Sequence, residues 1–409
     1  MKYGPFVQCD FVTSVNPEIL IWARETAGLD LETAARKIAL NSARGRSGAD
    51  RLAALEAGEA LPSSGLLQRM AQQYHRPLLT FYMVKPPAPA ELGQDFRTLP
   101  DRGDPSNVLL ATLLRDVKAR QSLVRDALED DEERPPVELV GSLSRVVDAA
   151  ELSNALAAAI GFSRDEFRAK QSVEKAFAYL RALVEAQGIF VLLAGDCGHW
   201  STAIEVRVFR GFAISDRVAP FIVINDQDAK SAWSFTLLHE LCHILLGKSG
   251  VSGGAPNGDI EQLCNDAAAA TLIEAKEVRM ANLAISGDGS DVVSIINALA
   301  NRARVSRSMV AYQLYRSAAI SRAAWEELSD QFRAEWLDVK ARQKEKSKIK
   351  PGAPDWYVVR RQRLGAALLS VARQGIADGS LTPTRAARML GVKPMRVYPL
   401  LADPRRAHS

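Results

Sequence analysis

Apolar side chains recur at the spacing of an α-helix through the first part of the chain. This periodicity predicts helices over residues 16–28, 31–39, 48–57 and 66–82. Asn16 is expected to cap the first helix, with Pro17 at its first position, and Asp30 to cap the second. The short connections between these helices predict a helical bundle at this end of the chain.

The hydrophobic period changes in the middle of the chain. Strands are predicted where β-branched and aromatic residues gather between turn residues, over 188–194, 203–214 and 220–225. Together they predict a small, mostly antiparallel sheet. Helical periodicity covers the segments on both sides, over 106–127, 146–187, 236–247, 259–273 and 291–320. The predicted fold class is therefore α+β and mostly helical.

A helical extension is predicted after residue 320, beginning with a helix over about 321–346. Near its end, Thr382 and Pro383 are expected to open a helix that Gly391 ends, and a second helix follows Pro394. Because Ala386 and Ala387 in the first helix allow close packing, this pair of helices is a candidate helix-turn-helix.

The expected domains follow from these changes of pattern. They are a helix-turn-helix bundle over 1–85, a Pro-rich linker and helical arm over 86–145, a mixed domain over 146–320 and a basic helical extension over 321–409. The chain shows no long uninterrupted apolar stretch and no apolar core of a signal peptide. Its four Cys lack the spacing of a disulfide framework. We therefore expect a cytoplasmic protein.

A His-Glu-x-x-His motif lies inside an apolar helical run. Four-residue spacing puts His239 and His243 on one face of the helix, where two neutral imidazoles can hold one Zn²⁺. Glu240 lies beside them and can act as the base on a zinc-bound water. The alternative is a buried helix whose two His bond to neighbouring groups.

A third zinc ligand is available on the helix predicted over 259–273. A return loop can bring Glu261 against the two His, which gives a His₂Glu set with an open fourth position, as in catalytic zinc sites. Asn265 or Asp266 can then orient a ligand imidazole. The alternative for Glu261 is a solvated carboxylate at a helix start.

Two Cys lie close to these ligands in sequence. Cys242 is within the motif and Cys264 lies one turn after Glu261. A redox-switched zinc site is one interpretation, and small buried residues at a close helix contact is the favoured one.

The segments 211–226, 235–247 and 261–273 together resemble the ImmA/IrrE family of metallopeptidases. This resemblance implies a zincin-like fold related to thermolysin, with His239, His243 and Glu261 as zinc ligands and Glu240 as the catalytic base. It also implies a substrate, a DNA-bound repressor whose cleavage derepresses genes. One departure is Glu274, which stands where the family often has Pro.

Residues 1–85 resemble an XRE-type helix-turn-helix, an arrangement that often precedes the peptidase in this family. The resemblance is carried by the short helices and by Leu55-Glu56-x-Gly58-x-x-x-Pro62. Arg44, Arg46 and Arg51 are the candidate DNA contacts of this bundle. The alternative is a bundle that binds protein or docks on the peptidase.

Charge favours the other end of the chain for nucleic acid. Residues 1–85 carry ten Lys and Arg against eight Asp and Glu, whereas residues 317–409 carry eighteen against nine. The candidate contacts there are Arg385, Arg388, Lys393 and Arg396. The alternative is a helical cover whose charges are solvated.

The patterns predict a zinc metallo-endopeptidase, and the family resemblance implies that it regulates transcription by cleaving a partner repressor. One alternative is a DNA-binding regulator whose zinc domain is sensory or structural. Another is an antitoxin-like interaction protein that binds a partner without cleaving it. His199 is either an oxyanion-stabilising group or a surface histidine in a turn.

Overall fold

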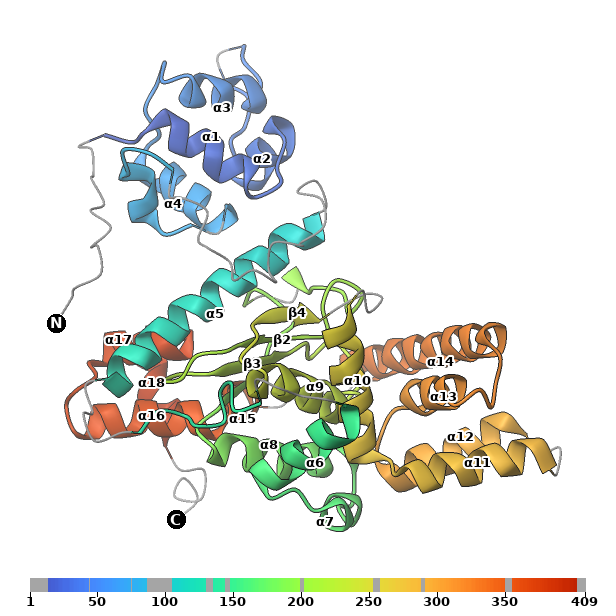
Figure 1. Cartoon of the computed structure of the whole chain (residues 1–409). Coiled ribbons are helices and arrows are strands. Elements are labelled where there is room, and N and C mark those ends of the chain that lie inside the picture. Colours follow the sequence, from blue (N-terminus) through green and yellow to red (C-terminus); the bar gives the residue numbers. More distant parts are fainter. Residues whose placement is uncertain are drawn as a thin grey trace. The chain divides into compact units, whose positions relative to one another are not determined.

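The computed structural model shows a mostly helical protein with one small sheet, which confirms the expected α+β class (Figure 1). It describes residues 14–43, 45–74, 76–86, 105–129, 135–143, 148–198, 202–252, 258–287, 291–349 and 355–402. The chain forms two compact units, and the division between them falls after Leu114. None of the described helices has the length and hydropathy that a membrane-spanning segment needs.

Apart from an isolated β-bridge between Ala43 and Arg46, the regular elements in the described residues of the first unit are helices. Its elements are α1 (Pro17–Glu25), α2 (Leu31–Lys37), α3 (Gly48–Glu56), α4 (Ser64–Gln73), the 3₁₀ helix η1 (Leu78–Tyr82) and the start of α5 (Pro105–Glu129). The Asn16 side chain accepts a hydrogen bond from the backbone of Glu18, and Asp30 accepts one from Thr33. Both caps were predicted from the sequence and are confirmed.

A buried ion pair joins α1 to α3 in this unit. Arg24 donates through Nε to Glu56 Oε1 at 2.7 Å and through Nη2 to Glu56 Oε2 at 2.9 Å. Only 7% of the Glu56 side chain is exposed. A bidentate pair of this kind fixes the orientation of the two helices as well as their contact.

The second unit is built on a four-stranded sheet. Its strands are β1 (Phe190–Leu193), β2 (Gly211–Ile214), β3 (Phe221–Ile224) and β4 (Gly250–Ser252), in the order β1-β3-β2-β4. β2 pairs antiparallel with both β3 and β4, with Gly211 opposite Ile224 and Ser252. β1 pairs parallel with β3, with Phe190 opposite Phe221.

The sheet is mostly antiparallel, as predicted, with one parallel pairing and one strand shorter than predicted. β1 lies parallel to β3 because the chain forms β2 first, on the far side of β3, and then turns back into β3 between the two. Residues 203–210 are turns and irregular backbone, so β2 begins only at Gly211. All residues of β1, β2 and β3 are buried, and a strand covered on both faces carries no alternation that would reveal its direction.

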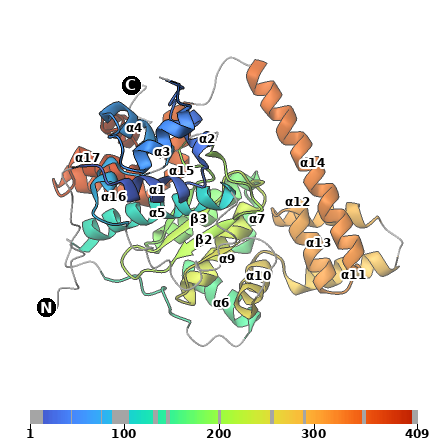
Figure 2. The ribbon, with the colours of Figure 1, turned by 90° about the horizontal axis from the view of Figure 1, so that it is seen from above.

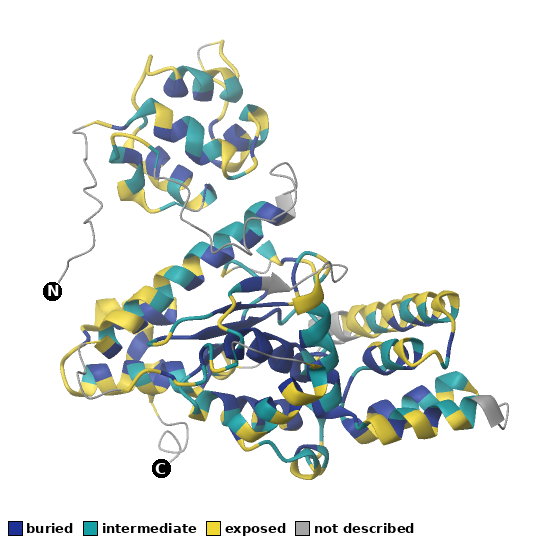
Figure 3. Ribbon diagram, viewed as in Figure 1, coloured by how far each residue is buried: buried dark blue, intermediate teal, exposed yellow. Residues whose placement is uncertain are grey.

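Helices cover the sheet on both faces (Figures 1 and 3). One face is covered by α9 (Trp233–Leu245), behind which lie α6 (Ala149–Ile160), α8 (Val173–Ala186) and α10 (Asp259–Leu272). The second half of α5 lies over the other face, where Gln121 donates to the carbonyl oxygen of Ala219 at 3.0 Å. The core residues therefore gather around α9, which is buried along almost its whole length.

Four helices follow α10 and pack on one another. They are α11 (Ala275–Gly287), α12 (Val292–Ala303), α13 (Arg307–Arg316) and α14 (Arg322–Ile349). Figure 2 shows that α14 lies against α13 and extends beyond it. In that extension Lys340 donates to the carbonyl oxygen of Gln227, in the segment between β3 and α9.

The last helices are tied to the edge strand β1. They are α15 (Trp356–Leu364), α16 (Ala366–Ala377), α17 (Pro383–Leu390), the 3₁₀ helix η4 (Pro394–Arg396) and α18 (Val397–Leu401). Arg181 of α8 donates to the carbonyl oxygens of Val191 in β1 and Gln362 in α15. Its partner Glu185 accepts from the backbone N–H of Ala366 at 3.0 Å, which caps α16.

A second contact holds these helices to the strand ends. Arg363 pairs with Asp196 at 2.9 Å and with Asp226 at 2.7 Å. Asp196 follows β1, and Asp226 follows β3 at the start of the segment that leads into α9. The C-terminal helices are thus part of the second unit and contact the segment that leads into its central helix.

Candidate metal centre

The helix α9 carries the His-Glu-x-x-His motif into the core. Leu237, Leu241 and Ile244 are fully buried and belong to the main hydrophobic cluster. A Cβ atom at Gly211 of β2 would lie 2.7 Å from both Thr236 and the Glu240 carboxylate. Glycine at this position therefore allows α9 to lie close against the sheet, because any side chain would occupy the place of Glu240.

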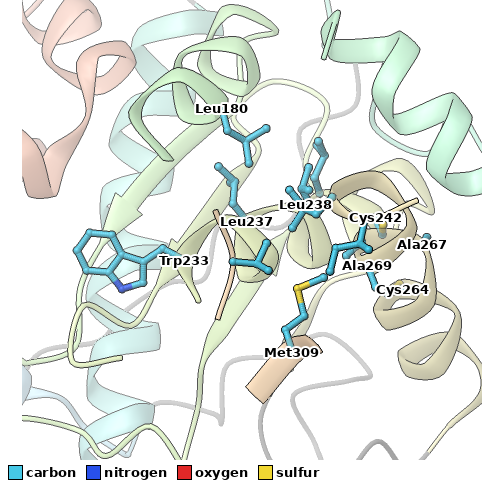
Figure 4. Close-up of a cluster of buried hydrophobic side chains, with 14 of the residues drawn as sticks. Leu180, Trp233, Leu237, Leu238, Cys242, Cys264, Ala267, Ala269 and Met309 are labelled. Atoms are coloured by element: carbon cyan, nitrogen blue, oxygen red, sulfur yellow. The ribbon is translucent and has the colours of Figure 1, made fainter. Parts of the chain in front are cut away.

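The helix α10 packs closely along α9. Figure 4 shows Cys242 together with Cys264, Ala267 and Ala269 at this contact. The two thiols interact directly, and this hydrogen bond together with burial raises the pKa of Cys264. Both Cys are fully buried, which fits their interpretation as small residues where two helices meet.

The contact between α9 and α10 brings three predicted side chains to one point. The Nε2 atoms of His239 and His243 lie 3.1 Å apart. Glu261 Oε1 lies 3.1 Å from His243 Nε2, and Glu261 Oε2 lies 3.3 Å from His239 Nε2. Both His are buried, whereas 34% of the Glu261 side chain is exposed. The three side chains therefore open to solvent on the Glu261 side.

This donor set fits a metal ion with tetrahedral preference. A tetrahedral zinc with bonds of about 2.0–2.1 Å separates neighbouring ligand atoms by about 3.3 Å. The three ligand atoms lie 3.1 Å, 3.1 Å and 3.3 Å apart, which is close to that ligand–ligand distance. Two imidazole nitrogens and one carboxylate are also the donors that zinc takes in catalytic sites.

The ionisation of the site suits a cation. Burial lowers the pKa of His239, which keeps the imidazole neutral and able to bind metal. Burial opposes ionisation of Glu261, but hydrogen bonds with His239 and His243 outweigh it and hold the pKa of Glu261 below its ordinary value. The carboxylate therefore carries its charge at neutral pH.

The neighbouring polar residues of α10 face two directions. The Asn265 side chain hydrogen-bonds with His239, which partly offsets the lowering of the His239 pKa by burial. Asp266 instead accepts a hydrogen bond from Gln262 at 2.8 Å and pairs with Arg316 of α13 at 3.1 Å. Of these two residues, Asn265 therefore has the position expected of a group that orients a metal ligand.

The C-terminal end of α10 is held by two arginines of α7 (Arg164–Arg168), which the sequence pattern did not single out. Arg164 donates to the carbonyl oxygens of Ala270 and Thr271, and Arg168 donates to that of Leu272. These contacts satisfy the carbonyl groups that a helix end leaves without partners. Because α10 carries Glu261, they also fix the position of a candidate ligand, although short amphipathic segments like α7 give no signal of such a role.

The candidate DNA contacts of the first unit are partly engaged within it. Arg51 donates to the carbonyl oxygen of Asn41 at 2.5 Å, and Arg46 lies 4.0 Å from Glu59. Arg44 and His199 lie outside the described residues.

The candidate contacts of the second unit are exposed. They are Arg385 and Arg388 on α17, Lys393 in the following turn and Arg396 in η4.

Comparison with known proteins supports a metallopeptidase. A family model described as Peptidase_M78, IrrE N-terminal-like domain, matches residues 203–315, the segment that contains His239, His243 and Glu261. This match supports the ImmA/IrrE family and its metal-dependent peptidase function. No curated protein and no solved structure is significantly similar to the chain.

Proposed function

We propose that the protein is a zinc-dependent metallo-endopeptidase that regulates transcription by cleaving a partner repressor. The observation that carries the proposal is the convergence of His239, His243 and Glu261 within 3.1–3.3 Å of one another on two packed helices. In this proposal the second unit has a zincin-like fold.

The chain's own residues divide the work of peptide hydrolysis. A bound Zn²⁺ supplies Lewis-acid polarisation of the scissile carbonyl and of the attacking water. Glu240 takes the proton of that water and delivers it to the leaving amine. Its carboxylate is fully buried against Gly211, where low exposure strengthens its interaction with a nearby cation. Asn265 orients His239 through the hydrogen bond between their side chains.

The proposed regulatory role rests on what surrounds the peptidase. Residues 1–85 are proposed as an XRE-type helix-turn-helix, supported by their short capped helices and the Leu55-Glu56-x-Gly58 pattern. The domain limits 86–145, 146–320 and 321–409 are proposed with it. In the ImmA/IrrE resemblance such a module accompanies cleavage of a repressor, so a regulatory protein is the proposed substrate.

Two carboxylates in the motif region separate metal binding from catalysis. We expect Glu261→Gln to lose zinc and activity together, and Glu240→Gln to keep zinc and lose activity. Asp259→Asn is the matched control, because Asp259 is exposed in the same first turn of α10 as Glu261. Zinc is measured by elemental analysis of the purified protein. Cleavage is measured by comparing new protein N-termini in cells that hold the wild type or Glu240→Gln.

Unchanged protein N-termini would contradict a proteolytic role. If cells with wild-type protein and cells with Glu240→Gln show the same protein N-termini while zinc is retained, the site is not proteolytic. The alternative is then a DNA-binding regulator with a sensory or structural zinc domain, favoured by the exposed basic residues of α17 and η4. An antitoxin-like protein would instead hold its partner stably and uncut.

A further inference from the structure

The C-terminal helices α16, α17 and α18 form a small three-helix arrangement. Its inner side chains are buried, including Leu368, Ala386, Leu390 and Leu400. The helix α17 ends at Gly391, which adopts the left-handed conformation with φ of 59°, and η4 begins after Lys393. Two helices joined by a short turn of this kind are the elements of a helix-turn-helix.

The basic residues of this segment divide into two sets. Residues 355–402 contain eight Lys and Arg against two Asp and Glu. Four arginines act inside the fold. Arg360 donates to the carbonyl oxygens of Leu390 and Gly391, Arg361 and Arg373 to that of Leu400 or Leu401, and Arg363 to Asp196. These four have structural partners and need no ligand to explain them.

The other four basic residues lie together on the helix pair from α17 to η4, and all are exposed. Within the described part of the chain, Arg388 and Lys393 make no ion pair and no side-chain hydrogen bond. Arg385 lies 3.7 Å from Asp126, and this carboxylate offsets the positive charge that Arg385 adds to the surface. Arg396 lies over the Trp356 ring at 4.4 Å, which holds its guanidinium on the surface.

Exposed apolar side chains accompany these charges. Met395 in η4 is 79% exposed, and Tyr398 in the first turn of α18 is 60% exposed. In a helix-turn-helix the N-terminal residues of the second helix meet base edges, while basic residues around them meet phosphates. Large side chains that remain in solvent at these positions are suited to apolar contact with bases.

We propose that α17, η4 and α18 bind double-stranded DNA, with Arg388, Lys393 and Arg396 on phosphates and with Met395 and Tyr398 against the bases. DNA is the proposed partner because its phosphates complement the positive charge of these side chains, and because a pair of helices carries that charge. The peptidase proposal is independent of this surface, because the residues of the two sites do not overlap.

The test measures binding of the full chain to a fluorescently labelled 30-base-pair DNA duplex over a range of salt concentrations. The double variant Arg388→Ala with Lys393→Ala should bind at least about ten-fold more weakly, and the slope of log affinity against log salt should fall by about 2. Tyr398→Ala should weaken binding with an unchanged slope, because it removes no charge. The matched control is Arg333→Ala with Arg342→Ala on α14, two exposed arginines outside this surface.

The proposal is overturned if the Arg388 and Lys393 double variant binds like the wild type, or if the control variant loses as much affinity. Tighter binding to single-stranded DNA or to RNA than to the duplex also overturns it. Circular dichroism of each variant excludes loss of folding as the cause. Measuring binding with Glu240→Gln as well separates the two proposals, since that variant should bind DNA like the wild type whether or not the protein is a peptidase.

Discussion

Glu274 donates its backbone N–H to a carboxylate oxygen of Glu277 at 3.0 Å, in the link between α10 and α11. Its own carboxylate pairs with Arg164 at 2.9 Å. Proline often occupies this position in the family that the sequence resembles, and proline has no N–H to donate. In this chain the link between the two helices therefore uses a different set of contacts, which depends on a residue other than proline.

The first prediction concerns this position. Glu274→Pro should lower the free energy of unfolding by about 1–3 kcal/mol, because the Glu277 carboxylate loses a donor in a largely buried place. Glu274→Gln keeps the N–H and should cost much less, because it changes only a solvent-screened ion pair. Urea denaturation measures both. A proline variant as stable as the wild type would show that the N–H contact contributes little.

The pH dependence of stability should show the contribution of the ionised Glu277 carboxylate. Burial raises its pKa, but hydrogen bonds with Arg168 and with the Glu274 backbone outweigh this and hold the pKa below its ordinary value. The ionised form is thus favoured by folding, so its stabilisation is complete above the unfolded pKa of about 4.3 and is lost as pH falls through the folded pKa. We expect the stability difference between wild type and Glu277→Gln to shrink across that range. A constant difference from neutral to acid pH would contradict this.

Metal binding should stabilise the second unit. An ion that binds only the folded state raises stability with its concentration, so chelation should lower the melting temperature of the wild type. Glu261→Ala should melt at the same temperature with and without chelator. Asp259→Asn should behave like the wild type, and differential scanning calorimetry with added ZnCl₂ or EDTA measures all three.

Gly211 offers a test of the contact between β2 and α9. A methyl group at this position would lie 2.7 Å from the Glu240 carboxylate and from Thr236, so Gly211→Ala must displace one of them. We expect a stability loss of about 1–3 kcal/mol. Zinc content should change little, since the substitution reaches Glu240 rather than a ligand, but hydrolysis should fall. Equal loss of zinc and activity would place the disturbance at the ligands instead.

The two acidic partners of Arg24 should differ strongly in their contribution to the stability of the first unit. Glu56 pairs with it at 2.7 Å in a buried place, whereas Glu25 lies at 3.7 Å with 63% of its side chain exposed. Glu56→Ala should destabilise the first unit by about 3–5 kcal/mol, because a largely buried guanidinium loses both hydrogen bonds that Glu56 accepts. Glu25→Ala should cost between about 0 and 1 kcal/mol. Hydrogen exchange of α1 and α3 measures this unit separately from the other.

Local chemistry made part of the structure predictable. The spacing of His239 and His243 fixes them on one helix face, and the caps at Asn16, Asp30 and Thr382 need only their immediate neighbours. To place Glu261 beside the two His required one further assumption, that the chain returns after a loop rich in glycine. The structure brings these three side chains together as that assumption expects.

Contacts between distant segments could not be predicted from the sequence in this way. The parallel pairing of β1 with β3 depends on a crossover, and their uniformly buried residues fit either direction. The arginines that hold the end of α10 and the start of α16 are ordinary helical residues in sequence. Their roles arise only when a helix end is placed beside them, which tertiary packing decides.

The link between Arg363 and Asp196 joins residues that are 167 positions apart. A ribosome makes all three candidate metal ligands well before this arginine, so a nascent chain carries them while β1 still lacks its C-terminal cover. The order of synthesis therefore delays the finished support of the centre until translation has passed Arg363. A transcript that ends early would yield a chain with every metal-binding side chain and an uncovered sheet edge, a product prone to aggregation and degradation rather than to uncontrolled cleavage.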